Sequence, residues 1–518
     1  MYSKKIYITF FLFFLAIFVF FSSGHYGGDG LENYLVAQSI VKDGDLSIHD
    51  TEFGVKEMKY QKRGKIGSGG KIYSTHGLGM PILLVPLYFL GSIMSFFVKG
   101  VHPEYVTQLF VSFVNPIMCA GLSVVFILLL SELKYSMRIS FISTLILSFC
   151  TMSVVYSRSG FSEPAVTLCF LIAALFILRY LNTGLLRYIL YSGFFSGYPI
   201  LIKKTYLIYI ICFVLPLLVY GYKEKNVRKM VVNLSVLAIP LVIYLLIILG
   251  FNYVRYEGIL NTEYGTVSDV IAKVSTPHKY FKAFFYFFFS SGKGFFFFNI
   301  PLILFLFGVK DFCRRNKVFS FLVLSIILLN FSFHIYLFDR GTLFSWGPRY
   351  LYLSIPFFAV FLAHAIHESK YFSGKLAIWV LAIMGFLVQL PSLFINNSRW
   401  LFFLKEKLNV DEYMINYVPD LSPIKGTWYM CLSCLYNVKS DKSLAFGFDP
   451  DHRFITPANA FLSGYDSLDI WWFHALKVHS SMMPFVLILL VFIIGMASFT
   501  FYKIVYTLKM NDEKVGIS

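Results

Sequence analysis

Long apolar runs are the feature that most constrains the fold of this chain. Runs such as residues 5–23, 104–131 and 229–254 carry very few charged side chains and are separated by polar segments. A helix of about 20 apolar residues spans the roughly 30 Å hydrocarbon core of a bilayer. Because 57% of the residues are hydrophobic and only 14% are charged, a soluble domain could not bury this surface. The sequence predicts an all-α polytopic membrane protein.

Basic clusters at residues 222–229 and 310–317 indicate which ends of the runs lie in the cytoplasm. Cytoplasmic loops carry an excess of Lys and Arg, and the start at Lys4 and Lys5 and the C-terminal tail fit the same side. The formal net charge of +17 follows from this topology and does not indicate nucleic-acid binding. If successive apolar runs cross the membrane in opposite directions, counting from these cytoplasmic clusters predicts about twelve crossings. They are residues 5–23, 104–131, 138–156, 161–180, 185–203, 205–221, 229–254, 296–310, 318–338, 350–367, 375–396 and 481–503.

Three long segments fall on the outer side in this topology, at residues 24–103, 255–295 and 397–480. The apolar run 76–98 lies within the first of them and contains two prolines. We expect a re-entrant or interfacial helix there, because a simple crossing would break the alternation. Residues 30–42 predict a short helix that rests on the membrane surface. Outer loops on a rigid helical scaffold commonly carry the working surface.

Acidic and basic side chains gather at helix ends on the predicted outer side. They are Asp29 and Glu32 after the first run, Arg158 and Glu163 in the loop at 156–164, Lys203 and Lys204 after the 185–203 run, and Arg340 and Arg349 before the 350–367 run. Any one of them could be an interfacial anchor. Together they indicate an anionic partner, because positive charge on the outer side opposes the topological bias. Phosphate is the obvious anion for Lys and Arg.

Carboxylates beside a phosphate-binding cluster suit glycosyl transfer from a lipid phosphate. One carboxylate would accept the proton of the acceptor hydroxyl as a general base, while cations or a metal stabilise the leaving phosphate. Acids from separate loops, such as Asp29 and Glu163, could also hold a divalent metal such as Mg²⁺ or Mn²⁺ through oxygen ligands. The histidines are scattered singly and predict no histidine metal site.

The order of these residues resembles the GT-C glycosyltransferases. That class includes protein O-mannosyltransferases, lipid A aminoarabinose transferases and the oligosaccharyltransferase catalytic subunit, and it has bacterial glycosyltransferase-39-like members. The resemblance is strongest over residues 1–222, with one acid shortly after the first helix and a second acid after an arginine and an aromatic residue. It implies that Asp29 is the catalytic base or a metal ligand and that Glu163 is the second acid. It also implies that Lys203 and Lys204 contact the donor phosphate.

Two features depart from those enzymes. The Asp-Glu pair of the mannosyltransferases is represented by Asp29 and Glu32, one helical turn apart, so either acid could be the base; we favour Asp29. Oligosaccharyltransferases carry a WWDYG motif, whereas residues 468–475 read LDIWWFHA, so glycosylation of a peptide sequon is not expected.

The resemblance also implies a division of the chain. The parts are a catalytic transmembrane module at 1–222 with the outer loop 24–103, a variable transmembrane module at 223–396 with the outer loop 255–295, a small outer cap at 397–480, and a last helix with a cytoplasmic tail at 481–518.

Cys431 and Cys434 form a C-x-x-C pair in the predicted cap. Zinc or thioredoxin-like chemistry would require a second ligand pair or a βαβ pattern, and neither accompanies this pair. A small structural disulfide in an oxidising compartment is therefore expected. Cysteines in or beside the apolar runs are expected to pack as small apolar side chains.

The sequence thus predicts an inverting hexosyl- or pentosyltransferase of the cytoplasmic membrane, with its site on the periplasmic or extracellular side. It would move a sugar from a polyprenyl-phosphate donor to a glycan, lipid or protein acceptor. The assigned residues are Asp29 as base, Glu32 and Glu163 for the acceptor or a metal, and Lys203, Lys204, Arg158 and Arg349 for the phosphate. A lipid-linked glycan flippase, or a polymerase or ligase with a pyrophosphate-linked donor, are the alternatives.

Overall fold

The computed structural model describes residues 4–24, 30–49, 64–98, 101–260, 277–336, 344–440, 468–478 and 483–515. The first half of the chain forms α1 (Lys4–Phe20), α2 (Gly30–Lys42), α4 (Gly79–Ser95), α5 (Pro103–Ser112), α6 (Val114–Glu132), α7 (Met137–Phe149), α8 (Ser153–Tyr156), α9 (Glu163–Thr183), α10 (Leu186–Ile202), α11 (Ile210–Lys223) and α12 (Val227–Tyr256). The second half forms α14 (Pro277–Phe289), α15 (Phe295–Phe298), α16 (Phe305–Arg315), α17 (Lys317–Tyr336), α18 (Ile355–Glu368), α19 (Phe372–Gln389), α20 (Asn397–Phe402), α21 (Glu412–Tyr417), α22 (Pro423–Ser440), α24 (Trp471–Val478) and α25 (Met483–Val515).

The predicted fold class is confirmed: the protein is an all-α, multi-pass membrane protein. Within the described ranges, eight helices are long and apolar enough to cross a membrane. They are Pro103–Glu132, Glu163–Thr183, Lys204–Lys223, Val227–Tyr256, Lys317–Tyr336, Arg349–Glu368, Phe372–Leu393 and Met483–Met510. The count of about twelve crossings is not confirmed, because helices at several predicted crossings, among them α7, are shorter. Helix α4 also falls outside the eight, in keeping with its assignment as something other than a simple crossing.

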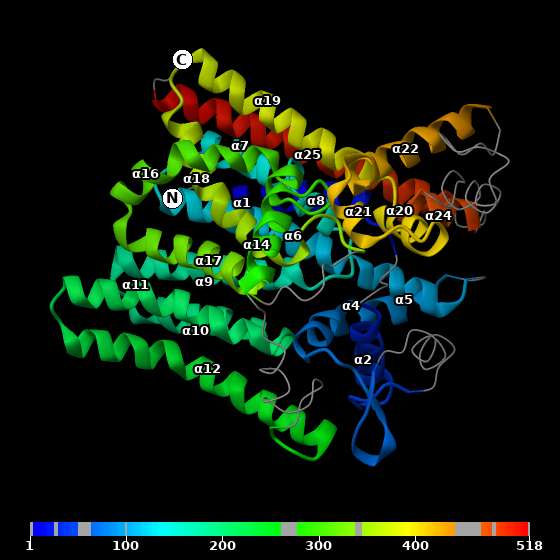
Figure 1. The fold of residues 1–518 in the computed structure, drawn as a ribbon, viewed down its shortest axis with the longest axis horizontal. Helices are drawn as coiled ribbons and strands as arrows, with labels where there is room; N and C mark the ends of the chain where they lie inside the picture. Colours follow the sequence, from blue (N-terminus) through cyan, green and yellow to red (C-terminus); the bar gives the residue numbers. More distant parts are fainter. Residues whose placement is uncertain are drawn as a thin grey trace.

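Most helices run side by side along the long axis of the molecule (Figure 1). The N-terminus, the C-terminus and the turn between α11 and α12 lie toward one end (Figure 1). At the opposite end, which we call the α2 end, α2, α4, α5, α20, α21 and α24 gather (Figure 1). A two-stranded hairpin of β1 (Lys65–Ile66) and β2 (Ile72–Tyr73) lies on this end and bridges to Ile48. Glu32, one of the predicted site residues, lies on α2 at this end.

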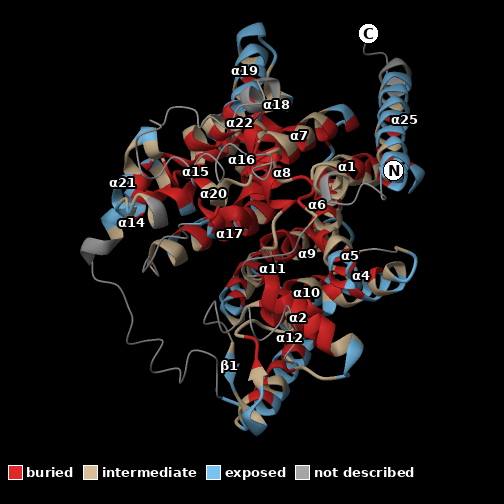
Figure 2. Ribbon diagram, turned by 90° about the vertical axis from the view of Figure 1, so that its right-hand side faces the viewer, coloured by how far each residue is buried: buried red, intermediate tan, exposed pale blue. Residues whose placement is uncertain are grey.

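Burial separates a packed interior from faces suited to lipid. Figure 2 shows buried residues concentrated in the middle of the bundle, with exposed residues on peripheral helices such as α19 and α25. Large apolar side chains on these outer faces are exposed, among them Leu246 of α12, Trp379 of α19 and Ile488 of α25. An apolar surface of this kind is expected where helices contact hydrocarbon rather than water.

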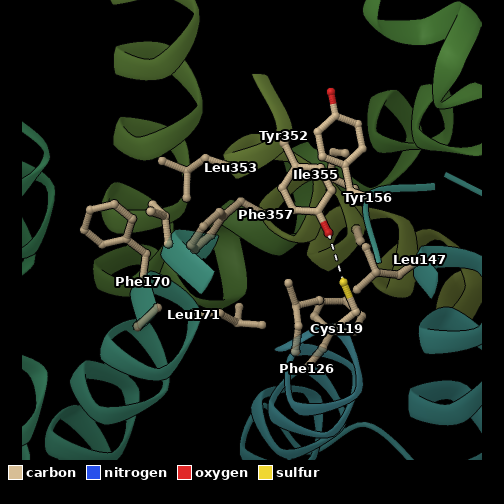
Figure 3. Close-up of a cluster of buried hydrophobic side chains, with 14 of the residues drawn as sticks. Cys119, Phe126, Leu147, Tyr156, Phe170, Leu171, Tyr352, Leu353, Ile355 and Phe357 are labelled. Atoms are coloured by element: carbon tan, nitrogen blue, oxygen red, sulfur yellow. Dashed lines mark hydrogen bonds between the residues drawn. The ribbon is translucent and has the colours of Figure 1, made fainter. Parts of the chain in front are cut away.

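An aromatic core fixes the 3₁₀ turn η4 (Arg349–Ser354), which leads into α18. The ring of Tyr352 stacks on Tyr156, with 4.8 Å between centroids, and its hydroxyl lies 3.8 Å from the sulfur of Cys119 on α6 (Figure 3). Leu353, Ile355 and other apolar side chains surround this pair (Figure 3). Because Tyr352 is fully buried, the start of η4 is held in one place, and this start carries Arg349.

The end of α1 is held by residues from far along the chain. Trp471 Nε1 donates to Val19 O at 2.8 Å, and Trp472 Nε1 donates to Phe20 O at 3.1 Å. Gly24 has a φ of +78°, and a Cβ atom there would lie 2.3 Å from Cβ of Trp471. Only glycine fits this close approach. The LDIWWFHA stretch is thus a docking segment for α1.

The disulfide expected between Cys431 and Cys434 is absent from the described structure. Both residues lie one turn apart on α22 and belong to a small apolar cluster with Trp400 and Leu401. Burial raises the pKa of the Cys431 thiol. The pair packs as apolar side chains on a helix, whereas the sequence predicted a disulfide in an outer cap.

Candidate functional site

A pocket opens at the α2 end where α2, the loop before α4, the start of α9 and the end of α10 meet. Its walls are formed by Asn33, His76, Met80, Gly160, Ser162, Ile202, Lys203 and Arg349. Two of these, Lys203 and Arg349, are predicted phosphate ligands. Asn33 and His76 were not predicted as site residues.

Glu163 forms ion pairs with both Lys203 and Arg349. Its Oε1 accepts from Arg349 Nε at 2.8 Å and from Lys203 Nζ at 3.4 Å. The Glu163 side chain is 3% exposed and that of Arg349 is 8% exposed, whereas Lys203 is 27% exposed and reaches toward solvent. The structure therefore brings together three of the predicted site residues, from α9, from the end of α10 and from η4.

Aromatic rings lie against both cations of this group. The Arg349 guanidinium carbon also lies 3.8 Å from the ring centroid of Phe161, and Lys203 Nζ lies 5.5 Å from that of Tyr350. Glu163 Oε2 has no hydrogen-bond partner in the described part of the chain. Lys and Arg side chains in a pocket wall suit an anionic ligand such as phosphate.

The backbone forms part of the pocket wall. Gly77 N donates to Ile202 O at 3.3 Å, and a Cβ atom on Gly77 would lie 2.1 Å from Leu201 O. A Cβ atom on Gly79 would lie 2.9 Å from Ile202 N. The two glycines thus let the loop before α4 lie directly on the end of α10, beside Lys203. This pair of glycines is the signal in the sequence that could have pointed to His76.

Glu32 is a structural acceptor for the same loop. It is 3% exposed, and its Oε2 accepts from Thr75 N at 2.7 Å and from the hydroxyls of Ser74 and Thr75 at 2.9 Å. Arg255 of α12 supports the loop from the other side, since its Nη1 donates to Ser74 O at 2.9 Å. An oxygen that already accepts three hydrogen bonds is poorly placed to accept a proton from substrate. The contacts fit a positioning role for Glu32 better than that of a base.

Replacing Glu32 by alanine is expected to lower the free energy of unfolding by about 3 kcal/mol, because three donors lose a charged acceptor. Glu32→Gln retains an oxygen acceptor at the same place and is expected to lose about 1 kcal/mol. Denaturant unfolding of the purified variants in mixed micelles would measure both. Equal losses in the two variants would show that the carboxylate contacts do not hold the loop.

Arg158 and Lys204 do not join the pocket group. The buried guanidinium of Arg158 contacts Ser392 O and the backbone and carboxylate of Asp469, with 3.1 Å between Nη2 and Oδ2. Lys204 Nζ lies 3.1 Å from Asn252 Oδ1 on α12. Arg158 instead ties the docking segment to the loop before α9, and Lys204 ties the end of α10 to α12.

Asp29, the favoured base, and Arg340 lie outside the described residues. The first described residue after that gap is Gly30, which opens α2, and Asn33 on the same helix lines the pocket. Asp29 directly precedes Gly30 in the sequence, and its role as base stays a prediction.

The described residues do not fit a divalent metal. Within the described ranges no group of three or more His, Cys, Asp and Glu side chains could hold one. Glu163 is a poor ligand, because Arg349 and Lys203 already contact its carboxylate and would repel a cation there. The expected metal site at Asp29 and Glu163 stays a prediction, because Asp29 lies outside the described residues.

Comparisons with known proteins point to one class. The family model described as "Dolichyl-phosphate-mannose-protein mannosyltransferase" matches residues 105–248, less than half of the chain. Over these residues it confirms the resemblance to protein O-mannosyltransferases, members of the GT-C glycosyltransferases. No curated protein matches the chain.

Two solved structures are similar in the arrangement of helices. ArnT from Cupriavidus metallidurans in the apo state is 11% identical, with a TM-score of 0.48 over 83% of this chain and 68% of that one. ArnT from the same organism bound to undecaprenyl phosphate is 11% identical, with a TM-score of 0.45 over 93% of this chain and 79% of that one. The identity and superposition are too low to carry function from these structures to this chain.

Proposed function

We propose that the protein is an inverting glycosyltransferase that takes a sugar from a polyprenyl-phosphate donor. The observation that carries the proposal is the pair of cations, Lys203 and Arg349, that line the pocket and both contact the buried carboxylate of Glu163. The phosphate of a lipid-linked donor is an anionic ligand of the kind that Lys and Arg bind. The family resemblance over residues 105–248 supports a lipid-phosphate donor.

The proposed reaction is a single displacement at the anomeric carbon. Asp29 accepts the proton of the acceptor hydroxyl, and the resulting oxygen attacks the anomeric carbon. The bond between that carbon and the phosphate oxygen breaks, and its electron pair leaves with the polyprenyl phosphate. Lys203 and Arg349 stabilise the charge that develops on this leaving group. Glu163 orients the two cations, and Asn33 and His76 line the same pocket.

The setting of the reaction belongs to the same proposal. The α2 end would face the periplasm or the cell exterior, since the basic clusters lie at the opposite end. The acceptor would be a hydroxyl of a glycan, a lipid or a protein. The sugar would be a hexose or a pentose.

A flippase is the alternative from another class. Transporters place ionisable side chains near the membrane midplane and line a path with them. Here the buried carboxylate and the pocket cations meet where the start of α9, the end of α10 and the start of η4 come together beside α2. This placement favours chemistry at one membrane face over passage through the membrane.

Transfer of radiolabelled sugar from a panel of polyprenyl-phosphate sugars in proteoliposomes tests the function. The wild-type protein is expected to move label to an acceptor, and Asp29→Asn is expected to lose transfer by about a thousandfold or more while still binding polyprenyl phosphate. A flippase would tolerate Asp29→Asn and move labelled lipid across the bilayer. Full transfer by Asp29→Asn would exclude Asp29 as the base.

A further inference from the structure

A buried lysine lies under the loop that supplies Arg349. Lys293, in the turn between α14 and α15, is 0% exposed. Its Nζ donates to Ser345 O at 2.5 Å, to Ser345 Oγ at 3.2 Å and to Gly347 O at 3.2 Å. A protonated lysine has three N–H donors, and this loop offers three acceptors that converge on one point.

The same loop is held from two other sides. Tyr156 OH donates to Trp346 O at 2.9 Å, and Trp346 Nε1 donates to Gln389 Oε1 at 2.8 Å. Gly347 has a φ of +59°, which lets the chain turn so that the carbonyl oxygens of residues 345 and 347 both face Lys293. Arg349 follows two residues later, at the start of η4. Its position therefore depends on the conformation that these contacts impose.

We propose that Lys293 is a positioning residue for donor binding, whose ammonium group holds the 345–347 loop so that Arg349 faces the pocket. This inference rests on the proposed function and deepens it. Lys293 does not line the pocket, so it acts on the donor through Arg349.

The protonation of Lys293 gives the inference a measurable signature. Burial lowers the pKa of Lys293 to about 7; the carboxylate of Glu412 raises it and the charge of Arg349 lowers it further. Glu412 belongs to α21, which is bonded to the same turn through Gly292 N and Asn416 O at 2.8 Å. As the pH rises through this value, the neutral amine loses one of its three donors and the loop is held less firmly. A donor phosphate bound beside Arg349 opposes the deprotonation of Lys293, because its negative charge favours the protonated lysine.

The test compares binding of polyprenyl phosphate and the KM of the donor from about pH 6 to about pH 8, on either side of the lysine pKa of about 7. In the wild-type protein the dissociation constant of polyprenyl phosphate is expected to rise about tenfold over this range. Lys293→Met is expected to bind about tenfold more weakly at the lower pH and to show no such rise. Its kcat at saturating donor is expected to fall much less than its affinity.

Two control variants separate positioning from general damage. Lys425→Met removes an exposed lysine on α22 and is expected to leave both the affinity and its pH dependence unchanged. Tyr156→Phe removes the hydrogen bond to Trp346 O and is expected to weaken binding severalfold while keeping the wild-type pH dependence. This variant tests the loop independently of the lysine.

Several results would overturn the inference. A wild-type affinity that stays constant over the pH range would do so even if Lys293→Met fails to fold. The same holds for a Lys293→Met variant with wild-type affinity and pH dependence. If the wild-type protein binds no polyprenyl phosphate at any pH, the proposed function fails as well, and this result differs from the other two because it appears before any variant is made.

Discussion

Arg349→Met is expected to lower kcat/KM for the lipid-linked donor by about a hundred- to a thousandfold, the usual effect of removing one preorganised group that stabilises a developing charge. The variant is also expected to lose about 3 kcal/mol of stability, because Glu163 would remain buried with only the 3.4 Å contact to Lys203. Arg349→Lys keeps the charge but not the planar fork and is expected to lie between the wild type and Arg349→Met. Single-turnover transfer and denaturant unfolding in micelles measure the two effects.

A second substitution separates the catalytic effect from the structural one. In the double variant Glu163→Gln with Arg349→Met, no buried carboxylate is left without its main partner, so most of the lost stability is expected to return. Transfer is expected to stay as low as in Arg349→Met, because the phosphate ligand is still missing. Recovery of transfer together with stability would mean that the ion pair serves folding alone.

Lys203→Met is expected to raise the KM for the donor by about thirtyfold, which corresponds to the loss of one hydrogen bond to a charged group. Stability is expected to change little, because the Lys203 side chain is 27% exposed and Glu163 keeps its 2.8 Å contact to Arg349. Steady-state transfer over a range of donor concentrations, with thermal unfolding of the same preparations, measures both quantities.

The neighbouring lysine is a matched control for this experiment. Lys204 has the same charge and lies one residue further along the chain, but its Nζ is 3.1 Å from Asn252 Oδ1 on α12. Lys204→Met is expected to change the donor KM by about twofold or less. Equal effects of the two substitutions would show that the local charge matters and the pocket geometry does not.

The fold was largely predictable because hydrophobicity and helix length are readable along the chain. The predicted crossing 296–310 is not a single helix in the structure. The run is apolar apart from Asn299 and the terminal Lys310. Asn299 has non-helical angles (φ −140°, ψ 51°), and the segment is divided into α15, a 3₁₀ turn and α16. Hydropathy describes composition, whereas Pro301 removes a backbone donor and interrupts the helix. A count of crossings from composition alone therefore overestimates the number of long helices.

The sequence predicted which types of residue form the candidate site. It did not predict which of these side chains contact one another. Glu163 and Arg349 are separated by 186 positions, and no local pattern reports a contact over that distance. Lys203 and Lys204 diverge because Lys203 has an extended backbone between α10 and the following 3₁₀ turn, so neighbouring side chains point to different helices. Arg158 was grouped with Glu163 by proximity in sequence, but the turn between them directs its guanidinium to Asp469.

The contacts that hold the end of α1 set an order for the assembly of the protein during synthesis. Trp471 and Trp472 bond to carbonyl oxygens of α1 that precede them by 452 positions, and α1 also packs against α25. The ribosome synthesises α1 well before residues 471 and 472. The carbonyl oxygens at the end of α1 therefore lack these tryptophan donors until residues 471 and 472 have been synthesised. The contacts at the end of α1 are thus formed late in synthesis. A nascent chain that stops before residue 468 would have most of the bundle but not the contacts that complete its working end.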